Sequence, residues 1–303
     1  MKRGISDPDF RLLKMFKTVV ETGGFAPAQA QLNLSQPALS LQMGQLESRL
    51  GVRLCQRGRA GFRLTEEGRR VYESTLRLLN AAGEFGEQLE ALQGRLVGGL
   101  HLGIVDSVAT NPDFRLAEAI QRFKQRDGAV RLALHVAPPP ELERAVLDGR
   151  YHLAIGHFPT RVGSLQYRHL LREAHQLYVG RHHPLFRSGR GAAGARIREL
   201  EHVVRGYATT RPAPPEAAVN ATATADNMEA ILVLILSGSF VGHLPVHFAE
   251  PWVKRRMLRA IPSPQFRFHT DFDLISRKDA MPTLATRTFL ADITSAFATA
   301  EAA

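Results

Sequence analysis

The segment from Phe25 to Leu50 places the strongest constraint on the fold, because its pattern predicts two short helices joined by a tight turn. Phe25–Leu32 is the first predicted helix, and Asn33-Leu34 is the turn. Ser35 is expected to cap the second helix, and Pro37 falls in its first turn, where a missing N–H costs little. The pattern therefore predicts a helix-turn-helix, whose second helix can enter the major groove of DNA.

The second helix has an apolar side and a neutral polar side. Leu39, Met43, Leu46 and Leu50 recur at helical spacing and are expected to be buried. The other side chains suit base edges, because Gln pairs bidentately with adenine, Ser donates or accepts, and Leu contacts a thymine methyl group. The predicted DNA contacts of this helix are Ser35, Gln36, Pro37, Ser40, Leu41 and Gln45.

No charged residue lies between Glu21 and Glu47, so cations that neutralise phosphates must come from the flanks. Residues 1–66 contain ten Lys and Arg against five Asp and Glu, in a chain with a net charge of +10. A wing is predicted after Gly51, with strands at 53–57 and 62–64. Its predicted phosphate contacts, which position the protein without specifying sequence, are Arg53, Arg57, Arg59 and Arg63.

Thr65 is expected to cap a long helix, because Glu66 and Glu67 then fall in its first turn, where the helix dipole favours acidic residues. Apolar side chains along this helix alternate at intervals of four and three residues, the spacing of a coiled-coil seam. The alternative is a helix packed on the protein's own core, which needs a wider apolar stripe. We predict dimerisation through a seam that includes Val71, Leu78, Phe85, Leu89 and Leu92.

Length and composition limit the remaining possibilities. At 303 residues, 44% of them hydrophobic, the chain suggests two or three domains with ample cores. A single Cys excludes an intrachain disulfide framework and a Cys-based zinc site. The longest apolar run, at 230–236, is far shorter than the ~20 residues needed to cross a bilayer, and no signal-peptide pattern begins the chain. We expect a cytoplasmic protein with no membrane partner.

From Leu100 onward the pattern changes to alternating strands and helices, which is typical of a parallel α/β sheet. The first predicted unit has strands at 100–105, 130–136 and 153–156 and helices at 113–126 and 140–147. The second has strands at 166–171, 175–179, 203–207, 219–223 and 239–243 and a helix at 227–236. A final strand at 266–276 and a helix at 282–298 are expected to return to the first unit.

In the helix-turn-helix and the wing, the chain resembles the LysR-type transcriptional regulators. The resemblance rests on Phe25, Ala30, Leu32, Leu34, Ser35, Gln36, Pro37, Ala38, Ser40, Leu46, Glu47, Leu50, Gly51, Leu54, Arg57, Leu64, Thr65 and Gly68. The chain departs from the family pattern at three positions. Gly24 replaces a usual Ser, Pro27 falls at the start of the first helix, and Cys55 replaces a usual Phe, which implies looser packing under the wing.

The resemblance implies a mixed fold. Its parts are an N-terminal all-α winged helix-turn-helix DNA-binding domain at 8–65, with the motif at about 25–44, a dimerising linker helix at 66–93, and an effector-binding regulatory domain at 94–303. The regulatory domain is implied to be a two-lobed α/β domain of the type II periplasmic-binding-protein-like fold, with lobe I at about 97–162 and 267–303 and lobe II at about 163–266. The implied partners are double-stranded promoter DNA, a small-molecule effector and further copies of the chain, as a homodimer or homotetramer.

Ligands of open α/β sheets bind beyond the carboxyl ends of the strands, and the resemblance implies an effector between the two lobes. Two helix N-termini and Arg205 favour an anionic group, whereas Asp106 would repel one if it points inward. We hypothesise a small carboxylate with a hydroxyl or amine for Asp106. Helix capping is the alternative role for Ser107 and Thr110. The predicted effector contacts are Asp106, Ser107, Thr110, Gly156, His157, Phe158, Arg205, Tyr207 and His243.

Neither catalysis nor metal binding is predicted. The sequence has no Gly-x-Ser-x-Gly elbow, no P-loop and no Gly-x-Gly-x-x-Gly directly after a predicted strand. His175 with His182-His183, and His243 with His247, lack a carboxylate or Cys at metal-ligand spacing, so no metal or cofactor is expected. We predict a DNA-binding transcriptional regulator controlled by a small molecule. The alternative is a small-molecule-binding or catalytic α/β protein whose N-terminal helices serve oligomerisation only.

Overall fold

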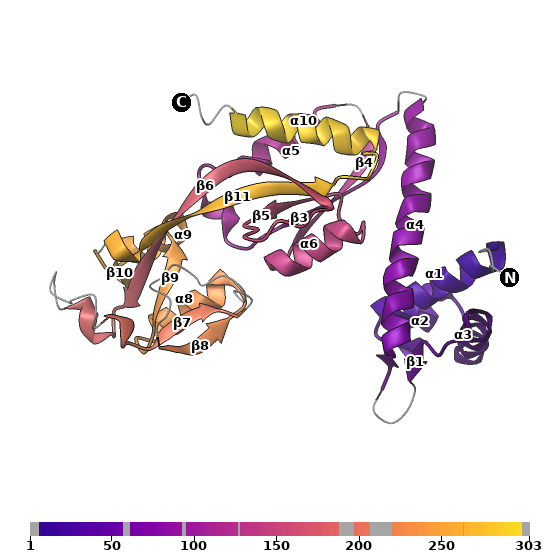
Figure 1. The fold of residues 1–303 in the computed structure, drawn as a ribbon, viewed down its shortest axis with the longest axis horizontal. Coiled ribbons are helices and arrows are strands. Elements are labelled where there is room, and N and C mark those ends of the chain that lie inside the picture. The colour runs from indigo at the N-terminus through magenta and orange to yellow at the C-terminus, as the bar shows by residue number, and fades with distance from the viewer. Residues whose placement is uncertain are drawn as a thin grey trace. The chain divides into compact units, whose positions relative to one another are not determined.

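The computed structural model describes residues 6–56, 61–92, 95–126, 128–187, 197–206, 220–262 and 264–298. The chain forms two compact units, one of Met1–Leu89 with Asp148–Arg150 and one of Glu90–Leu147 with Tyr151–Ala303. Each unit has hydrophobic cores of its own, and Figure 1 labels the helices and strands of both.

The first unit begins with three helices, α1 (Asp7–Glu21), α2 (Phe25–Leu32) and α3 (Gln36–Leu50). Asn33 adopts the left-handed conformation after α2, with φ 51°, so the chain turns sharply toward α3. Ser35 Oγ caps α3 by accepting a hydrogen bond from the backbone N–H of Ala38 at 3.4 Å. Pro37 and Pro27 both lie in the first turn of their helices, where no backbone donor is lost. The predicted helix-turn-helix is confirmed.

The core between these helices is closed to solvent. Phe16, Val19, Leu39, Met43 and Leu46 are fully buried. Burial of one such side chain stabilises the fold by about 1.5–3 kcal/mol. A short antiparallel wing, β1 (Cys55–Gln56) and β2 (Arg63–Leu64), follows α3. Its strands are shorter than predicted, but its place in the chain is confirmed.

Leu50 departs from the predicted buried stripe of α3, because its side chain is 43% exposed. The helix ends at this residue, and Gly51 turns the chain away in the left-handed conformation with φ 76°. Leu54 and Cys55 are buried after the turn, so the core continues through the wing instead. The spacing of apolar residues predicts burial one position too far along α3, because a spacing pattern does not show where a helix ends.

A long helix, α4 (Glu66–Leu92), follows the wing and begins at the predicted cap. Thr65 Oγ1 accepts from the Gly68 backbone N–H at 2.8 Å and donates to the Arg53 carbonyl oxygen at 2.7 Å. A Cβ atom built on Gly68 lies only 1.9 Å from the Leu54 carbonyl oxygen. The first turn of α4 therefore packs directly on the chain that enters the wing, with no room for a side chain at Gly68.

The apolar seam of α4 divides into two parts. Val71 and Leu78 pack against the core of the first unit. The prediction that they pair with a second chain did not anticipate these contacts within their own chain. Phe85, Leu89 and Leu92 are 62%, 50% and 84% exposed. The exposed part of the seam thus begins only in the second half of the helix.

One continuous sheet organises the second unit, with the strand order β4-β3-β5-β11-β6-β9-β7-β8 and with β10 paired to β6. The long strands β6 and β11 pair antiparallel and join two lobes, as Figure 1 shows. We define lobe I by β3, β4 and β5 and lobe II by β7 to β10. The strands are β3 (Val97–Ile104), β4 (Ala129–Val136), β5 (Leu153–Gly156), β6 (Leu165–Gly180), β7 (His202–Arg205), β8 (Ala221–Ala225), β9 (Val241–Pro245), β10 (Leu258–Ala260) and β11 (Arg267–Arg277).

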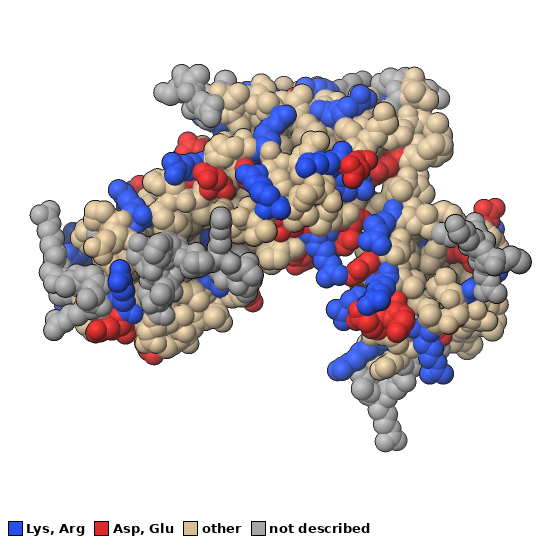
Figure 2. All heavy atoms as spheres, in the orientation of Figure 1, with Lys and Arg blue, Asp and Glu red and all other residues tan. Residues whose placement is uncertain are grey.

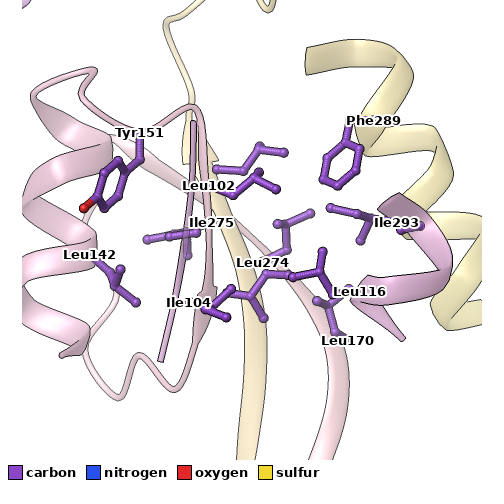
Figure 3. Packing of buried hydrophobic residues seen from close by; sticks show 14 of the residues in the cluster. Leu102, Ile104, Leu116, Leu142, Tyr151, Leu170, Leu274, Ile275, Phe289 and Ile293 are labelled. Atoms are coloured by element: carbon purple, nitrogen blue, oxygen red, sulfur yellow. The ribbon is translucent and has the colours of Figure 1, made fainter. Parts of the chain in front are cut away.

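In lobe I, β3 pairs parallel with β4 and β5. The helices of this lobe are α5 (Leu116–Lys124), α6 (Pro139–Leu147) and α10 (Leu284–Ala298). Figure 3 shows Leu142 of α6 on one side of the sheet and Leu116, Phe289 and Ile293 of α5 and α10 on the other. The final helix therefore returns to the first lobe, as predicted.

Lobe II combines β7, which pairs parallel with β8 and β9, with the helices α8 (Met228–Leu236) and α9 (Val246–Lys254). The prediction missed α9, because Pro251 lies inside it and prolines usually end helices. The prediction also missed the three-residue strand β10. It also split β6 into two strands at the charged residues Arg172 and Glu173. These residues stay paired with β11, opposite Asp271 and Thr270, so β6 is one strand of 16 residues.

Candidate DNA interface and effector site

The outer surface of α3 is neutral and exposed. Gln36, Pro37 and Gln45 are exposed, Leu41 is 65% exposed, and Ser40 is half-buried. The helix thus presents the amide groups of Gln36 and Gln45 beside the exposed apolar side chain of Leu41. These are the groups that a major groove can accept, and their contact with DNA stays a prediction.

The wing is fixed to α3 by the carboxylate of Glu47. Its Oε1 accepts hydrogen bonds from the backbone N–H groups of Leu54, at 2.7 Å, and Cys55, at 3.3 Å. Arg53 and Arg63 are exposed on this part of the chain. Two other predicted phosphate contacts, Arg57 and Arg59, lie outside the residues that the structure describes.

An ion pair joins the start of α1 to the end of α3. Arg49 Nε lies 2.5 Å from Asp9 Oδ1, and Arg49 Nη2 donates to Ser6 Oγ at 2.8 Å. The hydrogen bonds from Arg49 and Ser6 hold the pKa of Asp9 well below its usual range. The charge of Arg49 is therefore matched within the domain.

Asp106 forms the first of two polar links between the lobes. It follows β3, and its Oδ2 accepts a hydrogen bond from the backbone N–H of Met228, the first residue of α8. Asn227 Oδ1 caps the same helix by accepting from the Ala230 N–H at 2.8 Å. The helix dipole favours a carboxylate at this place. Asp106 therefore points toward lobe II and occupies the N-terminus at which the sequence placed an anionic effector.

The second link passes through Glu173, a carboxylate on β6 that is 3% exposed. Its Oε1 and Oε2 lie 2.8 Å from His247 Nε2 and His175 Nε2, respectively, and Asn111 Nδ2 donates to Oε1 at 3.3 Å. His247 Nδ1 lies 2.8 Å from Thr110 Oγ1. The network thus connects the loop after β3 in lobe I with α9 in lobe II.

Glu173 carries a negative charge in this network. Burial alone raises the pKa of Glu173, but the hydrogen bonds from His175 and His247 outweigh it and bring this pKa to about 2. Burial is also the main reason that the pKa of His175 is lowered, so this ring is neutral near pH 7. The link is therefore an ionised carboxylate held by hydrogen-bond donors.

The other predicted effector residues have varied surroundings. Ser107 is in the left-handed conformation with φ 62°, and Arg205 donates to Met228 Sδ at 3.7 Å, so both lie beside the Asp106 link. A Cβ atom on Gly156 would lie 2.7 Å from Val105 Cγ1, so a side chain there would force Val105 to shift. His157 Nδ1 lies 3.0 Å from the Asp271 carbonyl oxygen.

One predicted effector residue is buried inside a lobe, a second is half-buried, and a third is not described. Phe158 is 3% exposed in the core of lobe I, where its ring lies 6.3 Å from that of Tyr167, so it packs the core and does not face lobe II. His243 contacts Phe268 with ring centroids 5.1 Å apart, and burial lowers its pKa to about 3. Tyr207 lies outside the described residues.

The sequence prediction missed Glu173, His175 and His247 as interlobe residues. It considered both histidines only as metal ligands. In the described part of the chain, no group of three or more His, Cys, Asp or Glu is arranged to hold a metal ion. The available signal was the Glu-x-His alternation at Glu173 and His175, which places two polar side chains on one face of the strand, between Leu171 and Leu177.

Two family models match the chain, one for the bacterial regulatory helix-turn-helix protein of the lysR family at residues 10–69 and one for the LysR substrate binding domain at residues 93–298. The chain belongs to the LysR family of transcriptional regulators. The HTH-type transcriptional activator BauR of Pseudomonas aeruginosa is 39% identical to this LysR-family chain over 290 residues, which cover 94% of each protein.

Solved structures agree in fold. CbnR, a LysR family transcriptional regulator, matches with a TM-score of 0.67 and 22% identity over 95% of this chain and 99% of its own. The structure of full-length CbnR with its target DNA matches with a TM-score of 0.64 and 21% identity, over the same shares of the two chains.

The family fixes the general function. The chain is a DNA-binding transcriptional regulator with a C-terminal effector-binding domain, and its curated relatives are named as regulators. The alternative of an enzyme with oligomerising N-terminal helices is therefore set aside. Across the described ranges, no helix combines the length and apolarity needed to cross a membrane.

Proposed function

We propose that this regulator recognises promoter DNA through the neutral outer face of α3, while exposed arginines beside the wing contact phosphates. The observation that supports this most directly is the exposure of Gln36, Leu41 and Gln45 on one uncharged helix, with Arg53 and Arg63 exposed after it. Uncharged groups can discriminate bases, whereas cations supply affinity that is independent of sequence. CbnR was solved with its target DNA, and we extend DNA binding of that kind to this chain.

Replacing Gln36 with alanine is expected to relax sequence preference. One bidentate pair contributes about 1–3 kcal/mol of discrimination, so the preference for the promoter over random DNA should fall by roughly 5-fold to 150-fold. The dependence of affinity on salt should not change, because no charge is lost. Mobility shifts on the DNA upstream of the gene measure both quantities. Gln31→Ala, at an exposed position of α2, is the matched control and should keep the preference.

Replacing Arg63 with alanine should have the opposite signature. Affinity should fall for promoter and random DNA alike, and the slope of log affinity against log salt should decrease by about 0.9 for one lost phosphate contact. An unchanged slope would exclude Arg63 from the phosphate contacts. If Gln36→Ala and Arg63→Ala behaved identically, the proposed division between base and phosphate contacts would be wrong.

We also propose that the exposed half of the α4 seam pairs with a second copy of the chain. Phe85, Leu89 and Leu92 are large apolar residues in heptad alternation, and all are at least half exposed. Phe85→Asp with Leu89→Asp should shift the chain toward a monomer in sedimentation experiments, because charges at seam positions are costly. Gly86→Asp, outside the seam on the same helix, should leave the assembly intact. An unchanged assembly in the double variant would rule out this seam.

The effector, we propose, binds between the lobes and is a small carboxylate with a hydroxyl or amine that can donate to Asp106. Ser107, Thr110 and Arg205 are its other proposed contacts, because they lie at the two interlobe links. The proposal has a direct mechanism, since a ligand that replaces either link changes how the lobes are held. A change in lobe arrangement can then alter the spacing of DNA-binding domains in the assembly.

Calorimetry with pairs of small hydroxy- or amino-carboxylates and their uncharged amides tests the effector class. A carboxylate should bind at least about tenfold more tightly than its amide, because charge-assisted hydrogen bonds contribute about 1.5–3 kcal/mol. Arg205→Gln should remove that difference. Arg172→Gln, an exposed cation on β6, should preserve it. Binding of uncharged compounds alone would overturn the carboxylate proposal.

A further inference from the structure

A cluster of cations lies at one end of lobe II, where α9 leads into β10. Lys254, Arg255 and Arg256 are consecutive and exposed. The backbone N–H of Arg181, an exposed residue directly after β6, donates to the Met257 carbonyl oxygen at 2.9 Å, so it lies beside this segment. Figure 2 shows Lys and Arg side chains on the visible face of lobe II, in the region where Figure 1 labels β10. We call Arg181, Arg255 and Arg256 the lobe II arginine cluster.

The chain itself does not neutralise this cluster. The neighbouring Lys254 is compensated, because its Nζ lies 2.9 Å from Glu250 Oε1. Within the described ranges, no carboxylate forms an ion pair with any arginine of the cluster. The Arg255 guanidinium instead lies 5.8 Å from the centre of the Trp252 ring, a contact that orients the cation without neutralising it. The positive charge of the cluster is therefore available to a partner.

The backbone at Arg256 shows that fold stability alone does not account for this residue. Arg256 is in the left-handed conformation, with φ 57°, after the last turn of α9. Its N–H donates to the Val253 carbonyl oxygen and the Met257 N–H donates to the Trp252 carbonyl oxygen, both at 2.9 Å. These two bonds form a Schellman motif, whose left-handed position usually holds Gly because a Cβ atom is strained there. Strain of this kind is a mark of functional positions.

The composition of the surface indicates which partner fits it. In the described segment 250–260, Val253 is the one large apolar side chain that is exposed, at 38%. Interfaces between proteins bury an apolar core, whereas interfaces with DNA are more polar and much more positively charged. Guanidinium groups also match phosphate oxygens in bidentate geometry. The chain belongs to a DNA-binding family, so its assembly already binds a polyanion of this chemistry.

We infer that the lobe II arginine cluster contacts the phosphate backbone of duplex DNA, as a second DNA-binding surface separate from the helix-turn-helix and the wing. This surface belongs to the effector domain. A ligand that changes how the lobes are held moves the cluster relative to lobe I, so effector binding can change the contribution of lobe II to DNA affinity. That consequence rests on the proposed interlobe effector site, whereas the DNA contact itself does not.

Mobility shifts of the full-length chain over a series of salt concentrations test the inference. Arg255→Gln with Arg256→Gln should lower the slope of log affinity against log salt by about 1.8, because two phosphate contacts are lost. The slope should fall equally on promoter and random DNA, because phosphates carry no sequence information. Arg172→Gln with Arg287→Gln removes two exposed cations outside the cluster and should leave the slope unchanged. Since random DNA is one of the probes, the result does not depend on promoter recognition by α3.

Arg256→Gly separates DNA binding from a structural role. Gly removes the strain of the left-handed position, so thermal unfolding should occur at a higher temperature, while the salt slope should fall by about 0.9. If Arg256 only complemented the dipole of α9, the slope would not change in this variant, and the inference would be wrong.

Two further outcomes of the salt series would overturn the inference. One is an unchanged slope in the Arg255 and Arg256 double variant, or an equal decrease in the Arg172 and Arg287 control. The other is a double variant that binds DNA as the wild type does but no longer regulates transcription by purified RNA polymerase. That result would assign the cluster to an acidic protein partner instead of DNA.

Discussion

Replacing Gly68 with alanine is expected to disrupt the junction between the wing and α4. The added Cβ atom would lie 1.9 Å from the Leu54 carbonyl oxygen, a backbone atom that cannot rotate away. Either α4 or the chain entering the wing must shift. Overpacking of this kind costs about 1–3 kcal/mol and sometimes more. DNA affinity should fall as well, because Arg53 is adjacent to Leu54 and its carbonyl accepts from the Thr65 cap.

Hydrogen exchange gives the most direct measurement of this effect. The amides of Leu54 and Cys55, which donate to Glu47, should exchange faster in Gly68→Ala. Gly83→Ala is a matched control on the same helix, because a Cβ atom there has nothing within 4 Å. That substitution should stabilise α4 by up to about 1 kcal/mol through helix propensity. Equal exchange in wild type and Gly68→Ala would contradict the packing described here.

Replacing Glu173 with alanine should produce the largest loss of stability in the effector domain. The same buried acceptor would be lost to Asn111 in lobe I, His175 on β6 and His247 in lobe II. Each buried donor left without an acceptor costs about 1–3 kcal/mol, so the total loss should be several kcal/mol. Denaturant unfolding followed by the fluorescence of Trp252, the only Trp in the chain, measures this loss within the same domain.

The substitution of Glu173 should also change how stability depends on pH. The pKa of Glu173 is held at about 2, below the ordinary value of 4.5, so its contribution is present above about pH 4.5 and is lost as the pH falls toward 2. This contribution is on the order of 3 kcal/mol. Glu173→Ala should lack that part of the acid transition. Glu250→Ala removes an exposed carboxylate on α9 and should cost under about 1 kcal/mol. A Glu173→Ala protein as stable as Glu250→Ala would contradict the network.

The helix-turn-helix was predictable because its determinants are local. The cap at Ser35, the left-handed turn at Asn33 and the buried spacing of Leu39, Met43 and Leu46 all depend on residues a few positions apart. The error at Leu50 arose at a helix end, where periodicity stops being informative. The sequence could not show that only part of the α4 seam is exposed. The same apolar spacing is expected whether Val71 packs within its own chain or against another chain.

The interlobe links could not be predicted because they depend on residues far apart in the sequence. Asp106 meets Met228 across 122 positions, and Thr110 meets His247 across 137. Proximity to a strand end correctly suggested Asp106 and Thr110 as interlobe residues. It could not show that Asp106 itself occupies the α8 N-terminus, because that depends on how the two lobes pack. It also could not show that Phe158 turns into the core, because that depends on packing within lobe I.

Specific recognition of duplex DNA by α3 is the claim on which the whole account depends, and competition mobility shifts test it most directly. Full-length protein is bound to the DNA upstream of its gene at an ionic strength of about 0.15 M, with and without metabolite extract, against increasing random-sequence competitor. The account predicts that random DNA competes at least about 10³-fold less well than the promoter fragment. Equal competition by random and promoter DNA under both conditions would contradict it.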